Sequence, residues 1–61
     1  MEKLTPKELA VLKLLVKGLS NPEIAKELFV CASTVKVYVK NIFAKLGVKN
    51  RVQATAKAIR E

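Results

Sequence analysis

The sequence predicts an all-α fold, a four-helix bundle with a central helix-turn-helix. Helix-capping patterns occur at four places, patterns typical of strands are nearly absent, and few residues separate the second and third expected helices. A chain of 61 residues lies near the lower size limit for independent folding, where roughly 60% of the unfolded surface becomes buried. We therefore expect one domain over residues 1–61, with an aliphatic core because Phe29, Phe43 and Tyr38 are the only aromatic residues.

The first helix is expected over about residues 6–17. Thr5 and Glu8 have the spacing of a capping box, and Pro6 stands at the first helical position, where its missing N–H costs nothing. Gly18 suits the left-handed residue that ends many helices.

The second helix is expected over about residues 21–28. The segment Ser20-Asn21-Pro22-Glu23 supports two starts, a serine capping box or an asparagine cap followed by proline. The β-prone pair Phe29-Val30 should end this helix. The few residues before the next helix then form the short turn of a helix-turn-helix.

The third helix is expected over about residues 32–45, with Gly47 as a left-handed cap. At about 100° per residue, its core face carries Val35, Val39, Ile42 and Leu46, with Phe43 at the edge. The opposite face is a narrow, basic stripe of otherwise small side chains: Ser33, Lys36, Val37, Lys40 and Ala44.

The fourth helix is expected over about residues 51–60, because Asn50 and Gln53 form a further capping pattern. It has two apolar stripes, of which a helix in so small a domain buries one against its own body. We assign Ala54 and Ala58 to the core, and Val52, Ala56 and Ile59 to a partner helix in a dimer. The alternative is that both stripes are partly buried in the monomer.

The charge is strongly positive and unevenly distributed. Twelve basic and five acidic residues give a net charge of +7, and no acidic residue occurs between Leu28 and Arg60, where seven residues are basic. Such a chain presents a positive face that suits DNA, RNA, an anionic membrane or an acidic protein. The simpler reading is a well-solvated surface.

Several functions are excluded by composition. The chain has no His and no Asp, which removes the usual zinc ligands, the Ser-His-Asp arrangement and the commonest general base, so we expect no catalytic site, metal or cofactor. Lys13 and Lys17 interrupt the longest apolar run, which excludes a membrane span. A single cysteine, Cys31, and no recognisable leader indicate a cytoplasmic protein.

The basic stripe of the third helix has the residue types of a helix that reads DNA bases. Lys36 and Lys40, one turn apart, can donate to guanine O6 and N7 or to phosphates, and small Ser33 allows close approach. Val37 can meet a thymine methyl group, although a single exposed valine needs no function. We predict base contacts from these four residues.

Helix N-termini form a second layer, since their free N–H groups bind phosphate. Candidates for contact with the DNA backbone are Ser20, Asn21, Thr34, Lys49, Asn50 and Arg51, whose other possible role at these positions is plain capping. Tyr38 falls between the core and the stripe, where its hydroxyl could reach a phosphate or its ring could simply pack.

These motifs together resemble the LuxR-type (GerE-type) helix-turn-helix domain, most closely the output domain of NarL-like response regulators. The resemblance covers essentially the whole chain and rests on Leu4-Thr5-Pro6-Lys7-Glu8, Gly18-Leu19-Ser20-Asn21, Glu23-Ile24-Ala25, Ser33-Thr34-Val35-Lys36-Val37, Lys45-Leu46-Gly47 and Asn50-Arg51. Two positions depart from the pattern. Tyr38 stands where His is frequent, and Cys31 stands where Ser or Thr would cap better.

The resemblance implies sequence-specific binding of double-stranded DNA by a bacterial transcription regulator, within a two-component system, with RNA polymerase as a candidate partner. It implies base contacts from Lys36, Val37 and Lys40, and backbone contacts from Thr34, Lys45, Asn50 and Arg51. The fourth helices would pair in a homodimer on DNA, and Glu8 would bond within the fold.

Three alternatives are weighed against this function. A basic helical module could instead bind an anionic membrane or an acidic protein surface, but membrane binding favours Trp or Phe beside a broad apolar face, and the stripe lacks them. RNA binding lacks stacking aromatics on a sheet. A sigma-factor helix-turn-helix is related within the DNA-binding class.

We expect Cys31 to be a buried small hydrophobe, and the alternative is a redox-sensitive thiol.

Overall fold

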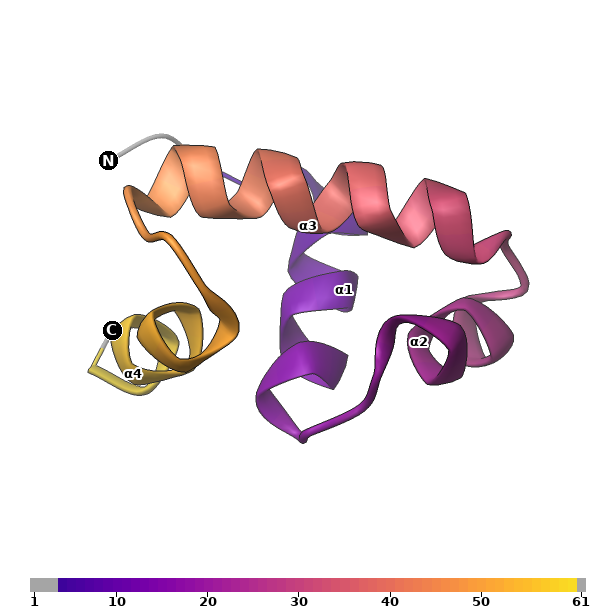
Figure 1. Ribbon diagram of the computed structural model, residues 1–61, viewed down its shortest axis with the longest axis horizontal. Helices are drawn as coiled ribbons and strands as arrows, with labels where there is room; N and C mark the ends of the chain where they lie inside the picture. The colour runs from indigo at the N-terminus through magenta and orange to yellow at the C-terminus, as the bar shows by residue number, and fades with distance from the viewer. Residues whose placement is uncertain (1–3, 61) are drawn as a thin grey trace.

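The computed structural model describes residues 4–60, which form four helices and no strand (Figure 1). The helices are α1 (Pro6–Val16), α2 (Asn21–Leu28), α3 (Ala32–Leu46) and α4 (Arg51–Arg60). The predicted all-α fold with a helix-turn-helix is confirmed, and each predicted boundary lies within one residue of the observed one. None of these helices is long and apolar enough to cross a lipid bilayer.

The first two helices begin with complete capping boxes. The Thr5 hydroxyl accepts from the Glu8 N–H at 3.2 Å, and the Glu8 carboxylate accepts from the Thr5 N–H at 3.0 Å. Ser20 and Glu23 make the same pair of bonds at 3.4 and 2.7 Å. Of the two starts that the sequence allowed for α2, the serine capping box is therefore the one adopted.

The start of α4 differs in one detail from the predicted capping box. Asn50 Oδ1 accepts from the Gln53 N–H at 2.9 Å, as expected for an N-cap. The Gln53 side chain, however, accepts from the N–H of Lys49 at 2.8 Å rather than from that of Asn50. The reciprocal bond therefore closes one residue further back, and Lys49 belongs to the cap.

A residue with a left-handed backbone follows the C-terminal end of each of α1, α2 and α3. Gly18 and Gly47 have φ of 97° and 70°, as their positions predicted. The end of α2 was predicted from the β preference of Phe29, yet Phe29 itself is left-handed, with φ of 58° and ψ of 45°. This conformation costs a non-glycine residue roughly 1 to 2 kcal/mol. The Phe29 side chain recovers nothing by packing, since it is 94% exposed.

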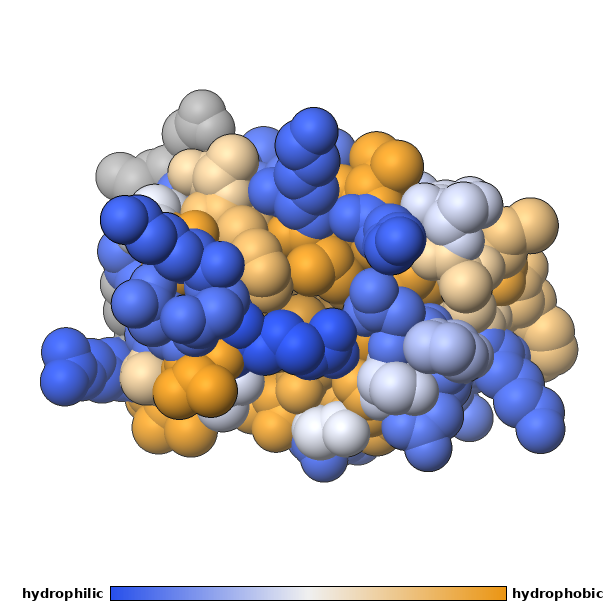
Figure 2. Space-filling model, viewed as in Figure 1, coloured by the Kyte–Doolittle hydropathy of each residue, from blue (hydrophilic) through white to orange (hydrophobic). Residues whose placement is uncertain are grey.

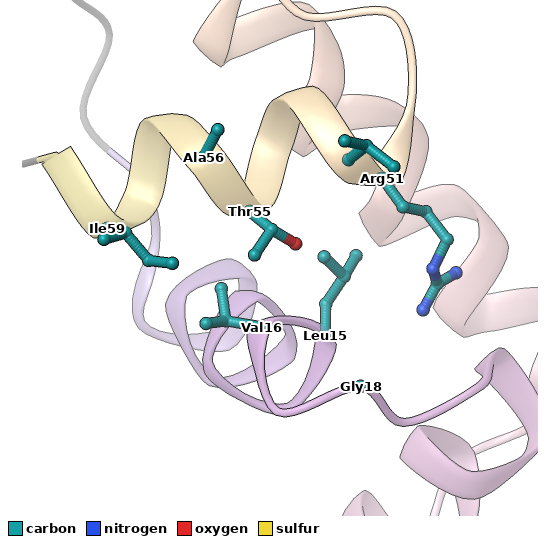
Figure 3. A pocket seen from close by; sticks show the side chains of 8 residues that line it. Leu15, Val16, Gly18, Arg51, Thr55, Ala56 and Ile59 are labelled. Atoms are coloured by element: carbon teal, nitrogen blue, oxygen red, sulfur yellow. The ribbon is translucent and has the colours of Figure 1, made fainter.

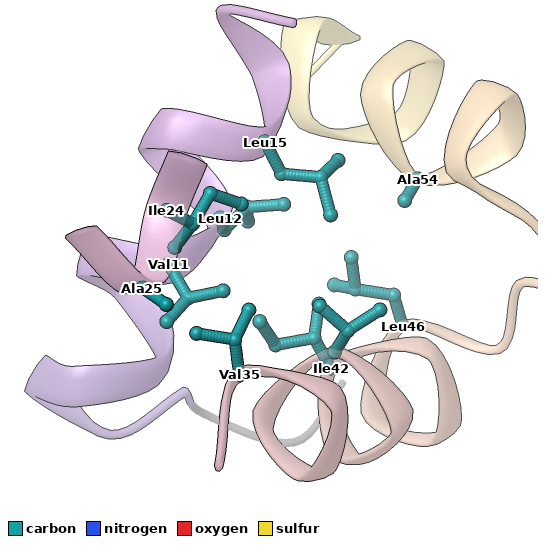
Figure 4. Close-up of a cluster of buried hydrophobic side chains, with 10 residues drawn as sticks. Val11, Leu12, Leu15, Ile24, Ala25, Val35, Ile42, Leu46 and Ala54 are labelled. Atoms are coloured by element: carbon teal, nitrogen blue, oxygen red, sulfur yellow. The ribbon is translucent and has the colours of Figure 1, made fainter. Parts of the chain in front are cut away.

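All four helices contribute side chains to one aliphatic core, and α3 crosses α1 (Figures 1 and 4). Its members are Val11, Leu12 and Leu15 from α1, Ile24 and Ala25 from α2, Val35, Val39, Ile42 and Leu46 from α3, and Ala54 from α4. The predicted core face of α3 is confirmed, with Phe43 half-buried beside it. In α4 the predicted core side is confirmed, because Ala54 is buried and Ala58 packs against the core.

The prediction that Cys31 is buried is wrong. Cys31 is the N-cap of α3 and lies exposed at the turn, beyond the reach of the core. Its side chain makes no capping bond, and only its carbonyl accepts, from the N–H groups of Thr34 and Val35 at 3.0 and 3.2 Å. The expectation of a weak cap at this position is confirmed.

Candidate nucleic-acid interface

The outward face of α3 is fully available to a large ligand. All five residues of the predicted stripe are exposed: Ser33, Lys36, Val37, Lys40 and Ala44. Figure 2 shows hydrophilic side chains with a hydrophobic area among them along the upper edge, where α3 runs. We call this surface the α3 stripe.

Packing on the opposite side of α3 fixes which way the α3 stripe points. Val35 and Ile42 are wholly buried and Val39 and Leu46 nearly so, so the helix cannot rotate about its axis without exposing them. Tyr38, between the two faces, is half-buried against the core, which agrees with simple packing. The α3 stripe is therefore presented on a rigid helix.

A buried carboxylate fastens the C-terminal end of α3 to α1. Lys45 Nζ donates to Glu8 Oε1 at 2.7 Å, and the side chains of the two residues are 24% and 6% exposed. The hydrogen bond from Lys45, followed by that from the Thr5 N–H, lowers the pKa of Glu8. Glu8 thus bonds within the fold, as the resemblance implied. The Lys45 ammonium group, which is predicted to contact the DNA backbone, uses one of its three N–H donors in this bond.

Arg51 connects α4 to the segment between α1 and α2. Its guanidinium donates to Asn21 Oδ1 at 2.9 Å and to the carbonyl of Leu19 at 2.7 Å. Three predicted backbone-contact residues, Arg51, Asn21 and the neighbouring Ser20, are therefore brought together at the N-terminus of α2. No local pattern predicts these two bonds, because Arg51 lies 30 and 32 residues from its partners.

The remaining predicted contact residues lie at the starts of α3 and α4. Thr34 is half-buried in the first turn of α3, whereas Lys49 and Asn50 are exposed just before α4. Capping already occupies the side chains of Ser20 and Asn50, so this alternative role is confirmed for both. The structure places six of the eight predicted backbone-contact residues at the N-termini of α2, α3 and α4, whereas Tyr38 and Lys45 lie further along α3.

Few acidic groups accompany the positive surface in the part of the chain that the structure describes. Within residues 4–60 the acidic residues are Glu8, Glu23 and Glu27, all outside α3 and α4. Glu8 is paired with Lys45, and hydrogen bonds from the backbone and side chain of Ser20 lower the pKa of Glu23. Across the described part of the chain, no three metal-binding side chains gather into a site. The arrangement of positive charge suits an extended anion.

The chain matches the family described as bacterial regulatory proteins, luxR family, over residues 2–58. It is 46% identical over 54 residues to the nitrate/nitrite response regulator protein NarL of Escherichia coli K12, covering 88% of this chain and 25% of NarL. It spans about a quarter or less of the length of the curated relatives it matches.

Two solved structures share the fold closely. The response regulator ChrA of a heme-sensing two-component system superimposes with a TM-score of 0.91 at 38% identity, over 98% of this chain and 30% of ChrA. The structure of the anti-activator RapF complexed with the ComA DNA binding domain contains a chain with a TM-score of 0.89 at 36% identity, over 92% of this chain and 97% of that one.

Proposed function

The chain belongs to the luxR family of bacterial regulatory proteins, and on that premise we propose that α3 is the recognition helix of its DNA-binding domain. As a LuxR-type helix-turn-helix domain of a transcription regulator, the chain binds double-stranded DNA. The proposal concerns which residues do so: Ser33, Lys36, Val37 and Lys40 read bases in the major groove.

One observation carries this assignment. The two lysines and Val37 of the α3 stripe are exposed on the side of the helix opposite four core side chains. A major groove about 12 Å wide admits one α-helix, and lysine donates there to guanine while an apolar group contacts the thymine methyl. Ser33 and Ala44 leave room for the helix to approach the base edges.

Most backbone contacts come from residues at the N-termini of α2, α3 and α4, and two more come from Tyr38 and Lys45 further along α3. We assign phosphate contacts to Ser20, Asn21, Thr34, Tyr38, Lys45, Lys49, Asn50 and Arg51. The guanidinium of Arg51 has five N–H donors, of which two are used within the fold. Its remaining donors and the helix N–H groups can therefore bind phosphate without dismantling the structure.

Two copies pair through α4 when DNA aligns them. Val52 and Ile59 are 78% and 73% exposed, and with Ala56 they form the stripe that α4 leaves outside the core. So small a surface falls well short of the roughly 1,200 Å² of a stable interface. DNA supplies the missing free energy by raising the effective concentration of the second copy.

The parent protein is a response regulator of a two-component system that acts in the cytoplasm. The relatives with that name are about four times longer than the aligned segment, so a separate regulatory part would accompany this DNA-binding domain. RNA polymerase is the partner through which such a bound regulator would affect transcription.

Selection of bound duplexes from a random DNA pool tests the proposal. We expect an enriched sequence with two half-sites about one helical turn apart, so that both recognition helices face the same side of the duplex. Anionic vesicles run in parallel should bind far less tightly at physiological salt. Failure to enrich any sequence, or equal binding to vesicles and DNA, would contradict the proposal.

A further inference from the structure

The C-terminal half of α1 and one face of α4 form an open groove of about 530 Å³. Its lining is mainly apolar and includes Leu15 and Val16 of α1 with Val52, Thr55, Ala56 and Ile59 of α4. In Figure 3, Val16 and Ile59 lie at one end, Leu15 and Thr55 lie between the helices, and Arg51 lies at the other end. We call this feature the α1–α4 groove.

Several apolar side chains of the α1–α4 groove are exposed to water. Val52 and Ile59 are among the most exposed large hydrophobic residues. Leu9, which is 43% exposed, lies two turns before Val16 on the same side of α1 and lengthens the apolar surface. Grouped apolar exposure of this kind marks interaction sites.

The rim of the groove is basic. Lys13 is exposed three residues before Val16, and Arg60 is exposed four residues after Ala56, so each stands next to a lining residue on its own helix. Lys17 is exposed between two lining residues, Val16 and Gly18. None of the residues that line the groove is acidic. An apolar floor is thus bordered by positive charge on both helices.

This pattern determines the chemistry of the occupant. Without DNA, the basic rims of two copies would repel each other, which agrees with pairing through α4 only when DNA aligns the copies. An apolar stripe bordered by carboxylates would be complementary in both respects. We propose that the α1–α4 groove binds an acidic amphipathic helix of another protein. Because α4 extends over about 15 Å, the bound helix needs roughly three turns.

The bound helix would leave the α3 stripe free. No residue of α3 lines the groove, and Figure 1 places α3 along the upper edge, away from the lower end of α1 and from α4. The helix would instead cover Val52, Ala56 and Ile59. This consequence, unlike the binding itself, rests on the dimer proposed above: the acidic helix opposes pairing of two copies on DNA but not binding to one half-site.

The test uses a synthetic helical peptide of about 15 residues, with a leucine stripe, glutamates beside it, and alanine and glutamine elsewhere. One control peptide has lysine for glutamate and another has the same composition in scrambled order. Fluorescence anisotropy should show binding of the acidic peptide to the whole chain and about tenfold weaker binding of both controls. Ile59→Glu should weaken the acidic peptide about tenfold, whereas Phe29→Glu, at an exposed position outside the groove, should not.

A charge reversal tests the rim separately. Lys13→Glu should weaken the acidic peptide and strengthen the lysine peptide, which a loss of folding cannot do. If Ile59→Glu melts early by circular dichroism, Val52→Glu replaces it. Equal binding by Ile59→Glu and the unchanged chain, or equal binding of the lysine peptide, would overturn the proposal. Loss of binding to a single half-site on adding peptide would place the peptide on the α3 stripe and also overturn it.

Two further results separate this proposal from the proposed function. Self-association without DNA in sedimentation velocity, which the peptide cannot reverse, would assign the groove to a second copy and overturn the proposal. Binding of the unchanged chain to one half-site, without peptide, reports on the DNA-binding assignment alone.

Discussion

Lys45, in the last full turn of α3, donates a 2.7 Å hydrogen bond to Glu8 in the first turn of α1. The same carboxylate oxygen accepts from the Thr5 N–H at 3.0 Å, so one buried group caps α1 and holds the far end of the recognition helix. The relationship connects two segments 37 residues apart. The attachment of the C-terminal end of α3 to α1 therefore depends on the charge of Glu8.

Stability should therefore depend on pH through Glu8. Its pKa is lowered in the folded chain from an ordinary value of 4.5, by Lys45 first and then by the Thr5 N–H. A lowered pKa means stabilisation that is complete above about pH 5 and is lost as the pH falls through the folded value. Glu8→Gln should lower the thermal midpoint at pH 7 by several degrees and flatten its decline in acid.

Thermal melts between neutral and acidic pH measure this effect. Lys45→Met removes the same bond from the other side and should reduce the pH dependence in the same direction. If the thermal midpoint of Glu8→Gln falls with decreasing pH as steeply as that of the unchanged chain, the ion pair does not set the stability in acid.

A second prediction concerns the strained turn of the helix-turn-helix. Phe29→Gly should stabilise the chain by about 1 kcal/mol, because glycine adopts a left-handed backbone without steric cost. Almost no packing is lost, since the phenyl ring is 94% exposed. Phe29→Ala is the matched control, because it removes the ring but keeps the strain. Equal denaturant midpoints for the glycine and alanine variants would argue against strain at this position.

Features encoded by neighbours in sequence were predictable. Capping boxes at Thr5 and Ser20, and the left-handed glycines, follow from side-chain chemistry within a few residues. The α3 core face follows from the helical repeat, because buried positions must recur on one side. The α3 stripe was then the opposite side of the same helix.

Features that depend on tertiary placement were not predictable. The bonds of Arg51 to Leu19 and Asn21 need α4 to fold back over the α1–α2 connection, which no local pattern encodes. Burial of Cys31 was predicted because free cysteines are usually buried. Cys31 is instead the N-cap of α3 at an outer turn, where no core lies beside it. The left-handed Phe29 is likewise imposed by the sharp reversal between α2 and α3.

Salt dependence should report the electrostatic part of DNA binding. If about 4 phosphates are neutralised, the logarithm of the binding constant should fall against the logarithm of salt concentration with a slope near −3.6. Arg51→Ala should weaken all sequences similarly, and should lower stability by about 1 to 2 kcal/mol because it loses two hydrogen bonds of a charged group. A salt-independent affinity, or an Arg51→Ala effect confined to one base position, would contradict the assigned phosphate contact.

Pairing on DNA should depend on the exposed stripe of α4. Ile59→Glu should abolish cooperative binding to two half-sites and leave the affinity for one half-site nearly unchanged, because a carboxylate cannot be buried cheaply between two copies. Gln53→Glu, an exposed position on another side of α4, should retain cooperativity. Gel-shift titrations measure both, and sedimentation should show a monomer without DNA. Retained cooperativity in Ile59→Glu would remove α4 from the interface.

The most direct test of the recognition helix compares the base preferences of Lys36→Ala and Lys40→Ala with those of the unchanged chain. Affinities are measured for a selected duplex and for its single-base variants. Each lysine substitution should weaken the binding free energy for the selected duplex by roughly 1 to 3 kcal/mol, and should reduce discrimination at particular base pairs. Lys26→Ala, which removes the same charge from α2, should leave the base preferences intact. If both α3 variants keep the preferences of the unchanged chain, the two lysines contact phosphate only and the proposed reading of bases by α3 is wrong.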